Sequence, residues 1–296
     1  MSEDGRSVER ARETVAVVGL GLMGGSLCRS LKALPSPPRV LGSDPAPLEG
    51  TYALEAGVVD RFDLEPEAIL PEADVVVYAA PMGPTLSLIR EHADAWRDDA
   101  LVTDVVSLKA PILRAAAAAG RGRQFIGAHP ICGGEESGFR ASRAELYRGV
   151  PIWLCAHDSA DSGARQRADA FWRQVGGVPK WIRAEEHDER MAWVSHLPQL
   201  LANALAGALD AAGYRPDDLG PGGRDMTRLA SSNPGMWKDL LEASAPVTGT
   251  GLTSVANALN VLGDLLARRE VERISEFMER TKAWREGGSG DHHGTG

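Results

Sequence analysis

Short apolar runs recur along the N-terminal part of the chain, and longer amphipathic stretches separate them. Uniformly apolar runs of this length are typical of strands buried on both faces, whereas apolar residues at every third or fourth position are typical of helices. The predicted strands cover residues 15–18, 39–43, 73–81, 100–106, 124–130, 150–157 and 179–183, and a short helix is predicted at 65–70. Because strands and helices alternate, we expect an α/β fold with a mostly parallel sheet.

The pattern changes at about Glu185, where strand signals end and only helical ones remain. Helices are predicted over residues 185–212, 236–243, 250–267 and 270–284. The last two carry apolar residues at helical spacing, namely Leu252, Val255, Leu259, Leu262, Leu266, Val271, Ile274, Phe277, Met278 and Trp284. One small helical domain would not cover such extensive stripes by itself, so we expect a homodimer.

A glycine-rich turn follows the first predicted strand. Gly19, Gly21 and Gly24 have the spacing of a dinucleotide-binding turn between a strand and a helix. The first glycine permits the turn, the second lets a pyrophosphate approach the backbone, and the third lets helix and strand pack closely. The N–H groups at the start of the helix, around Leu22 and Met23, are expected to bind the phosphates. The alternative is a doubly wound fold that binds no dinucleotide.

These patterns divide the chain into three parts. Residues 12–184 are predicted to form a Rossmann-like dinucleotide-binding domain, and residues 185–285 an all-helical domain that binds substrate and forms the dimer. Residues 286–296 are polar and rich in glycine, with nothing to bury, and we expect them to be a disordered tail.

Asp44 ends the second predicted strand, about 20 positions beyond the glycines, where an acidic residue binds the ribose hydroxyls of the cofactor. A carboxylate at this place would repel the 2′-phosphate of NADP. No cation follows it in residues 45–47, so we expect NAD rather than NADP. Ala80 and Pro81 lie at the carboxyl end of a later strand and are predicted to line the same crevice.

Composition and charge narrow the classes of function. The chain has 296 residues, of which 43% are hydrophobic and 25% charged, and this suffices for two domains with separate cores. It contains no apolar stretch as long as a membrane span, and residues 1–13 lack the apolar centre of a signal peptide, so we expect a cytoplasmic protein. A net charge of −9 without a basic stripe argues against nucleic-acid binding. An anionic substrate must therefore be bound by local cations.

The three cysteines are scattered and show neither a disulfide framework nor the spacing of metal ligands. Cys132 lies three residues after His129, so a thiol nucleophile is one interpretation. We prefer a small loop residue, because nothing else in that loop would orient a thiolate–imidazole pair. No metal is expected, and the pair His292–His293 is interpreted as part of a solvated tail.

Polar residues gather in four sets, which are Ser107 with Lys109, His129 to Gly138, Ser195 to Pro198, and Arg224 to Pro234. The first two sets follow strands at the carboxyl end, where open α/β sheets bind ligands. Pro198 interrupts a helical pattern and should kink the helix at His196.

Two arginines, Arg224 and Arg228, lie in the fourth set, which we expect to be a loop between helices. Arginines among hydroxyl residues are typical of an anion clamp, although most arginines pair with surface carboxylates. The histidines without an assigned role are His92, His157 and His187.

Taken with the glycine turn, the four sets resemble the motifs of the prephenate/arogenate dehydrogenase family of tyrosine biosynthesis. The matching motifs are Gly19–Leu27, Asp104–Lys109, His129–Pro130, Ser195–Pro198, Asp225–Ala230 and Pro234–Trp237, and the resemblance covers residues 14–285. The family combines a dinucleotide-binding domain with a helical domain that forms the dimer and completes the active site. Some members carry a further regulatory domain, which we do not expect here, so any inhibition by tyrosine should act at the active site.

The resemblance implies an NAD-dependent oxidative decarboxylation of prephenate or arogenate. Hydride leaves ring carbon 4 for NAD, the ring carboxylate leaves as carbon dioxide, and the ring becomes aromatic. His129 matches the base that accepts the proton of the 4-hydroxyl, and Ser107 would hydrogen-bond the same hydroxyl. Arg228 matches the arginine that binds a substrate carboxylate. His196 would line the pocket, and Lys109 would add positive potential.

The loop after His129 departs from the family pattern. Many members have Ala, Thr and Lys where this chain has Cys132, Gly134 and Glu136, so a polar contact and a cation are missing and a carboxylate is added. We therefore expect Glu135 or Glu136 to receive an ammonium group of the substrate. Arogenate carries such a group, and so does 4-amino-4-deoxyprephenate, the substrate of related antibiotic-pathway enzymes.

Two other interpretations compete with this one. The glycine turn is also similar to that of the β-hydroxyacid dehydrogenases, but we find no glycine-marked helix with a catalytic lysine, and the later motifs disagree. The second competing interpretation is a sensor that binds NAD without catalysis. It would need neither a histidine at a strand end nor Arg228.

Overall fold

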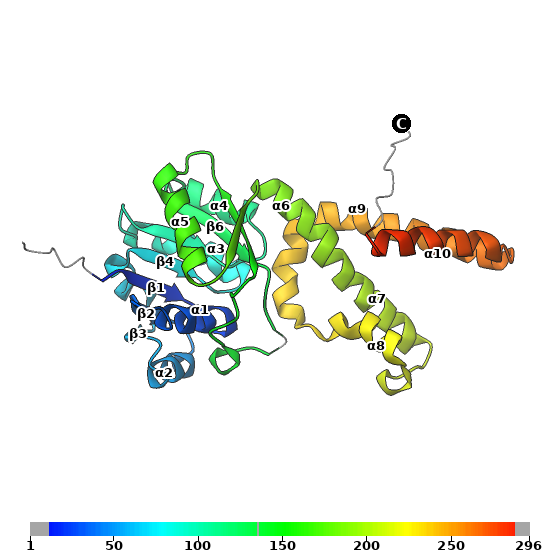
Figure 1. Cartoon of the computed structure of the whole chain (residues 1–296), viewed down its shortest axis with the longest axis horizontal. Coiled ribbons are helices and arrows are strands. Elements are labelled where there is room, and N and C mark those ends of the chain that lie inside the picture. The colour runs from blue at the N-terminus through cyan, green and yellow to red at the C-terminus, as the bar shows by residue number, and fades with distance from the viewer. Residues whose placement is uncertain (1–11, 135, 288–296) are drawn as a thin grey trace, which may run out of the picture.

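The computed structural model describes residues 12–134 and 136–287, in which a sheet domain and a helical domain lie side by side (Figure 1). The expected disorder of the C-terminal tail falls mostly on residues 288–296, outside the described residues. The strands are β1 (Thr14–Val18), β2 (Arg39–Ser43), β3 (Arg61–Asp63), β4 (Val75–Tyr78), β5 (Leu101–Asp104), β6 (Phe125–Pro130), β7 (Pro151–Ala156) and β8 (Val178–Trp181). The helices of the sheet domain are α1 (Leu22–Lys32), α2 (Pro47–Glu55), α3 (Met82–His92), α4 (Ala110–Ala118) and α5 (Ser162–Gln174).

The strands form one sheet in the order β3-β2-β1-β4-β5-β6-β7-β8. All neighbouring strands are parallel except β6 and β7, which are antiparallel. From β1 the chain adds β2 and β3 toward one edge of the sheet, and from β4 it adds strands toward the other edge. Ligands of open α/β sheets bind at the carboxyl ends of the strands at such a switch point, here between β1 and β4. The predicted Rossmann-like fold with a mostly parallel sheet is confirmed.

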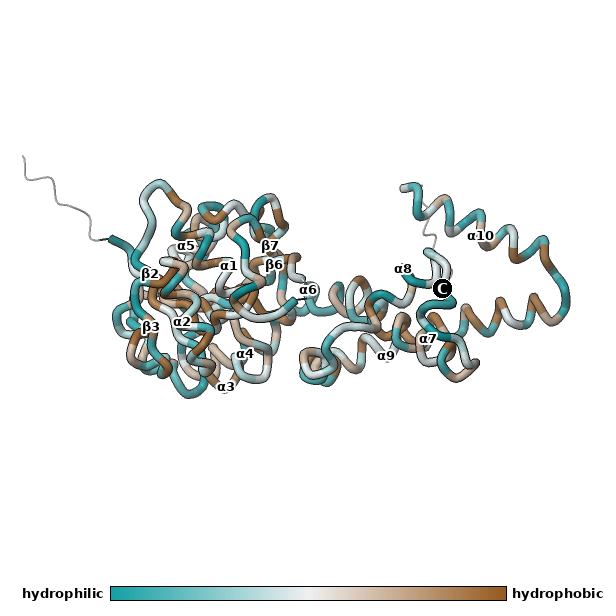
Figure 2. The backbone as a smooth tube through the Cα atoms, turned by 90° about the horizontal axis from the view of Figure 1, so that it is seen from below, coloured by the Kyte–Doolittle hydropathy of each residue, from teal (hydrophilic) through white to brown (hydrophobic). Residues whose placement is uncertain are grey.

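The central strands are buried on both faces, as their uniform hydrophobicity predicted. Val15 and Val17 of β1 pack into one apolar cluster with residues of α1 and α5, such as Leu27 and Phe171. The alternate residue Ala16 packs into a second cluster, with residues of α3 and α4 on the opposite face. Figure 2 shows the apolar segments concentrated inside this domain. The sheet and its two helical layers therefore hold the strand ends in fixed positions.

One edge of the sheet differs from the prediction. The helix expected at 65–70 is instead two 3₁₀ turns, Pro66–Ala68 and Leu70–Glu72, because each begins at or next to a proline that interrupts longer helical pairing. Strand β3 was not predicted, since its three residues are only partly buried and give no apolar run.

After Trp181, the last residue of β8, and up to residue 287, the described chain contains helices but no strand. They are α6 (Ala184–Met191), the π-helical turn Ala192–His196, α7 (Leu197–Ala211), the 3₁₀ turn Pro216–Asp218, α8 (Pro221–Thr227), the 3₁₀ turn Arg228–Ser231, α9 (Pro234–Ala267) and α10 (Val271–Arg285). No helix in the described parts of the chain is long and apolar enough to cross a lipid bilayer.

Two predictions for the helical domain were wrong. The segments expected at 236–243 and 250–267 belong to one helix, α9, which continues through Pro246 and changes direction along its length in Figure 1. A proline inside a helix can kink it without ending it when neighbouring elements pack against both sides. The expected loop from Arg224 to Pro234 is mostly ordered, as the end of α8 and a 3₁₀ turn.

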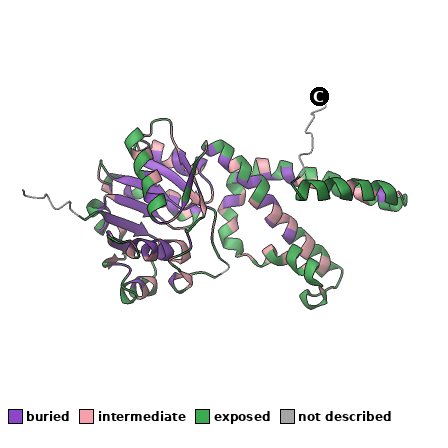
Figure 3. Ribbon diagram, viewed as in Figure 1, coloured by how far each residue is buried: buried purple, intermediate pink, exposed green. Residues whose placement is uncertain are grey.

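Much of α9 and α10 is exposed in the single chain (Figure 3). In these two helices, the large apolar side chains with more than half of their surface exposed are Met236, Leu259, Val261, Leu266, Val271, Met278 and Trp284. Contiguous apolar surface of this kind marks a protein interface, which agrees with the expected homodimer.

Candidate active site

The glycine turn has the geometry that its spacing predicted. Gly19 has a φ of +98°, and a Cβ atom there would lie 2.6 Å from the carbonyl oxygen of Ala79 at the end of β4. A Cβ atom on Gly24 would lie 1.8 Å from the carbonyl oxygen of Gly19. A Cβ atom on Gly21 would meet nothing within 4 Å, so the backbone faces open space where a pyrophosphate would lie.

The start of α1 offers hydrogen-bond donors to that space. Gly21 is the N-cap and supplies no side-chain hydrogen bond, so the first N–H groups of the helix, including those of Leu22 and Met23, lack a side-chain cap. The carboxylate of Asp44 lies beside them: Oδ2 accepts a hydrogen bond from the Leu20 N–H at 2.8 Å, and Oδ1 one from the Ala46 N–H at 2.8 Å. These residues fit a dinucleotide.

Ala80 and Pro81 lie between β4 and α3, next to that turn: a Cβ atom on Gly19 would lie 3.1 Å from the backbone nitrogen of Ala80. The Thr85 hydroxyl donates to the carbonyl oxygen of Ala80 at 3.0 Å, which fixes the chain at this point. In the next turn the N–H of Gly83 donates to Asp239 Oδ2 of α9 at 3.0 Å. The helical domain thus contacts the sheet domain directly beside the predicted cofactor crevice.

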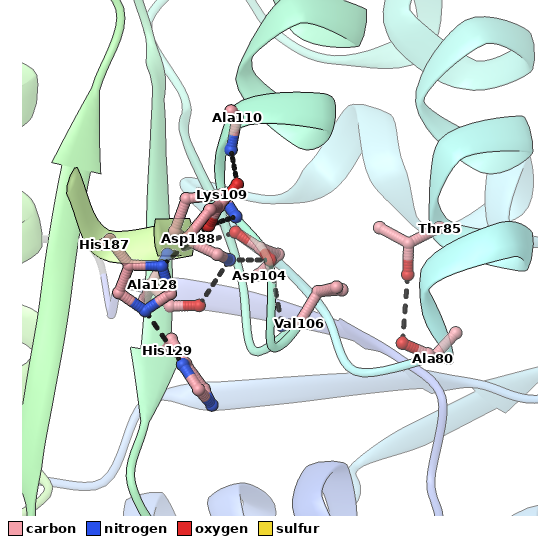
Figure 4. A network of polar contacts seen from close by, with 10 residues as sticks. All are labelled: Ala80, Thr85, Asp104, Val106, Lys109, Ala110, Ala128, His129, His187 and Asp188. Atoms are coloured by element: carbon pink, nitrogen blue, oxygen red, sulfur yellow. Dashed lines mark hydrogen bonds and ion pairs between the residues drawn. The ribbon is translucent and has the colours of Figure 1, made fainter. Parts of the chain in front are cut away.

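Lys109 has a different environment from the one expected. Its side chain is completely buried, and the ammonium donates to the carboxylate of Asp104 and, at 2.6 Å, to the carbonyl oxygen of Ala128 (Figure 4). Asp104 also accepts the Ala128 N–H at 3.1 Å. Because the ammonium is enclosed, Lys109 is not a surface cation of the pocket. It ties the loop after β5 to β6, one residue before His129.

His129 lies near the carboxyl end of β6 and contacts a second histidine that we had assigned no role. Its Nδ1 lies 3.0 Å from Nε2 of His187, and Nδ1 of His187 lies 2.8 Å from Oδ1 of Asp188 (Figure 4). His187 is completely buried on α6. The adjacent His and Asp were visible in the sequence, but nothing local indicated that α6 brings His187 into contact with His129 of β6.

The pKa of His129 is held well below the ordinary value for histidine. Burial is the largest cause, and electrostatic interactions with His187, Lys109 and His196 act in the same direction. A neutral imidazole is therefore the form of His129 at physiological pH, which suits a general base. Ser107 is half-buried, three residues beyond β5, the strand that pairs with β6.

His196 is buried between α7 and α9. Its Nδ1 lies 2.9 Å from the hydroxyl of Ser244, and its ring meets that of Trp237 edge-on with centroids 5.7 Å apart. The interruption predicted at Pro198 takes the form of the π-helical turn that ends at His196, a feature often found at functional sites. The side chain is directed toward the neighbouring helix at the junction of the two domains.

The two arginines of the fourth polar set are exposed, on short elements. Arg224 Nε donates to the carbonyl oxygen of Leu219 at 2.9 Å, and Arg228 begins the 3₁₀ turn. Gln199 of α7 holds this turn in place: its amide donates to the carbonyl oxygen of Leu229 at 2.7 Å and accepts the Ser232 hydroxyl at 3.2 Å. Gln199 was not predicted, because a glutamine in a helix gives no sequence signal.

Comparison with known proteins decides the family. A model described as the nucleotide-binding domain of prephenate dehydrogenase matches residues 27–180, and one described as its dimerization domain matches residues 183–280. The chain belongs to the prephenate dehydrogenase family. The resemblance seen in the motifs is confirmed, the protein is an oxidoreductase, and its helical domain is a dimerization domain, in agreement with the expected homodimer.

Several relatives match along almost the whole chain. Prephenate dehydrogenase of Bacillus subtilis is 26% identical over 291 residues, which cover 95% of this chain and 77% of that protein. Cyclohexadienyl dehydrogenase of Zymomonas mobilis is 27% identical over 277 residues, covering 91% and 94%. The crystal structure of prephenate dehydrogenase from A. aeolicus in complex with hydroxyphenyl propionate and NAD⁺ superimposes with a TM-score of 0.85 at 29% identity, covering 94% and 99%.

The loop that departs from the prephenate dehydrogenase pattern borders an open pocket of about 250 Å³, lined by Leu22, Gly134, Glu136, Ala141 and Arg143. Glu136 is exposed beside the glycine turn, whereas Glu135 lies outside the described residues. Arg143, whose guanidinium donates to the Gly133 carbonyl oxygen at 3.3 Å, provides a cation here. Arg143 reaches this region from farther along the chain, so the region contains a cation although Glu136 replaces the lysine of other members.

Cys132 lies in the same loop. Burial raises the pKa of its thiol to about 11, so the thiol stays protonated at neutral pH. This favours the small loop residue over the thiol nucleophile. In the described part of the chain, no cluster of three or more His, Cys, Asp or Glu side chains could hold a metal ion.

Proposed function

We propose that this protein catalyses the NAD-dependent oxidative decarboxylation of a cyclohexadienyl carboxylate, prephenate or arogenate, to an aromatic product. The observation that carries the proposal is the hydrogen-bonded His129 at the same carboxyl edge of the sheet as the dinucleotide turn, in a member of this family. The reaction balances with one hydride passed to the cofactor, one hydroxyl proton passed to a base and one carbon dioxide released. We also propose that the enzyme works in the cytoplasm.

NAD is the cofactor we propose, and it supplies the hydride acceptor when bound. The N–H groups at the start of α1 would hold its pyrophosphate, and Gly21 leaves the space for it. The carboxylate of Asp44 would accept hydrogen bonds from the ribose hydroxyls, and its charge supports NAD over NADP. Ala80 and Pro81 would line the same crevice.

The remaining roles follow from the positions of the side chains. His129 would accept the proton of the 4-hydroxyl at Nε2, since its Nδ1 faces His187, and Ser107 would hydrogen-bond the same hydroxyl. Arg228 would bind a substrate carboxylate with its planar fork. His196 would form a wall of the pocket at the domain junction. Lys109 would contribute by holding β6 rather than by touching the substrate.

A second part of the proposal concerns whether the substrate carries an amino group. Glu136 is a carboxylate in the open pocket beside the glycine turn, and an ammonium group on the substrate would be attracted to it. Arogenate and 4-amino-4-deoxyprephenate carry such a nitrogen, and prephenate does not. The 4-amino compound remains the alternative substrate, and an NAD-binding sensor without catalysis the alternative function.

The first experiment is the initial rate of NADH formation with prephenate, arogenate and 4-amino-4-deoxyprephenate in parallel, for the natural protein and His129→Ala. We expect turnover of prephenate or arogenate, reduced about 10³-fold or more in the variant, because a base and its positioned hydrogen bond are both lost. Activity on the 4-amino compound alone would move the enzyme to specialised metabolism. NAD binding without turnover of any of the three would favour the sensor. A prephenate rate equal to or above both amino substrates would exclude the role of the glutamates.

A further inference from the structure

Three side chains form a hydrogen-bonded chain that ends at the proposed base: Asp188, His187 and His129 (Figure 4). We propose that Asp188 and His187 are positioning residues that fix the tautomer of His129, so that its Nε2 carries the free lone pair. The inference rests on the proposed role of His129 as the base. Neither Asp188 nor His187 would touch the substrate.

Asp188 determines which atom donates in each of these hydrogen bonds, because both of its carboxylate oxygens accept hydrogen bonds. Oδ1 accepts the Lys109 N–H at 2.7 Å, and Oδ2 accepts the Ala110 N–H at 2.9 Å, at the N-terminus of α4. Both oxygens of the Asp188 carboxylate thus act as hydrogen-bond acceptors. A carboxylate has no proton to donate, so the proton of its 2.8 Å contact with His187 must lie on Nδ1 of His187.

The position of the proton on His187 in turn determines its position on His129. A neutral His187 with its proton on Nδ1 has a lone pair on Nε2, and this atom lies 3.0 Å from Nδ1 of His129. Nδ1 of His129 must therefore donate. The two rings meet at 80° with centroids 5.1 Å apart, so the lone pair of one ring lies in line with the edge of the other. Nε2 of His129 is left as the acceptor, and Figure 4 shows it on the side of the ring away from His187.

The chain also supports the charge that forms in the reaction. When His129 accepts a proton, its Nδ1–H bond to His187 becomes charge-assisted, and the carboxylate of Asp188 compensates the positive charge through His187. The other charged and titratable side chains that act on His129 are Lys109, whose charge Asp104 neutralises, and His196. Asp188 is thus the carboxylate connected to the base by hydrogen bonds.

The test is Asp188→Asn in the full-length protein. In one orientation the amide donates to His187 and reverses both tautomers, and in the other the negative charge is lost, so kcat should fall in either case. We expect a loss of about 10²-fold in kcat, since a carboxylate-to-amide change behind a catalytic histidine is known to cost up to ~10⁴-fold. The KM for substrate and the affinity for NAD should change less than about 3-fold, because no binding contact is removed.

Asp74→Asn is the matched control. Asp74 Oδ2 also accepts a backbone N–H, that of Thr14 at 2.9 Å, but Asp74 pairs with Arg97 rather than with a histidine. This variant should keep kcat within about 3-fold of the natural protein. A folded Asp188→Asn protein that matches the control in kcat would overturn the proposal.

His187 variants keep the proposal testable even where Asp188→Asn does not fold. His187→Leu removes the acceptor for Nδ1 of His129, whereas His187→Gln retains an amide oxygen that can accept. We expect His187→Gln to keep at least about 10-fold more kcat than His187→Leu, because only the first can hold the tautomer. Equal kcat values in the two variants would contradict the inference.

A spectroscopic readout separates this inference from the proposed function. ¹⁵N–¹H correlation spectra of the histidine rings, recorded without substrate, should show His129 protonated at Nδ1 and bare at Nε2, with its signals assigned by their loss in His129→Ala. A proton on Nε2 in the natural protein would overturn the proposed chain, whatever the activity. Full activity of His129→Ala would overturn the role of the base and leave the tautomer assignment standing.

Discussion

The two halves of the candidate site are built in opposite ways. The strand-end half contains His187 and the ion pair of Lys109 with Asp104, which are completely buried, and the partly buried His129. The helical half presents Arg224 and Arg228 on short, exposed elements. Burial lowers the pKa of a histidine and fixes its hydrogen bonds, whereas exposure keeps an arginine hydrated and accessible to an anion from solvent. The proposed proton transfer thus takes place in the more buried half of the site, and the proposed binding of the substrate carboxylate in the exposed half.

The difference follows from the elements that carry each half. β6 is paired on both sides and buried between two helical layers, so displacing His129 would disturb many contacts. The turn that carries Arg228 is held by Gln199 and packs chiefly on α7. We therefore expect changes in the first half to affect stability and kcat, and changes in the second half to affect substrate binding.

The largest expected effect is on stability. Lys109→Met should lower the free energy of unfolding by about 3–5 kcal/mol, because it leaves the buried carboxylate of Asp104 without its counter-ion. Chemical denaturation followed by circular dichroism measures it. Arg173→Met is the control, since it removes an exposed i,i+4 pair with Asp169 and should leave the midpoint nearly unchanged. Equal stabilities of the two variants would mean that the buried pair does not fix the strand end.

The next effect is on substrate binding. Arg228→Ala should raise the KM for the preferred substrate about 10²-fold, because a bidentate contact to a carboxylate is lost, while the affinity for NAD stays within about 2-fold. Steady-state kinetics and cofactor titration measure these quantities. Arg228→Lys should recover only part of the loss, since an ammonium lacks the fork.

Gln199→Leu tests the same role of the Arg228 turn in substrate binding without changing Arg228 itself. It removes the side-chain donor to the Leu229 carbonyl oxygen, which keeps the Ser232 N–H, and it loosens the turn, so KM should rise by about 10-fold or less with kcat nearly unchanged. If Gln199→Leu lowers kcat and leaves KM alone, the assignment of the helical half to binding is wrong.

The smallest effect is on the pH profile. Protonation of His129 should abolish its action as a base, and its pKa lies well below 6.5, so kcat/KM should stay level as the pH falls through 6.5 and decline only at lower pH. Initial rates from pH 5 to 8 in buffers of constant ionic strength test this. An acid limb centred at or above 6.5 would show that His129 is not the buried, low-pKa group that controls the rate.

The amino-acid sequence by itself determined the elements and the edge of the sheet at which chemistry occurs. Uniform apolar runs predicted every strand except β3, and the glycine spacing located the turn that follows β1. His129 could be singled out because a strand period places it at a carboxyl end, where parallel strands meet. Which residues of a strand or helix face the same side depends on their spacing along the sequence, so a local pattern suffices to predict it.

Only the tertiary structure decided which side chains meet. Lys109 was expected at the pocket and is buried against Asp104, His187 was given no role and contacts His129, and Gln199 gave no signal and holds the turn of Arg228. The contact between His129 and His187 joins residues 58 positions apart, and it depends on how α6 packs against the sheet. Hydrophobic periodicity fixes the face that an element buries, but not the partner that covers it, because many packings bury the same apolar area equally well.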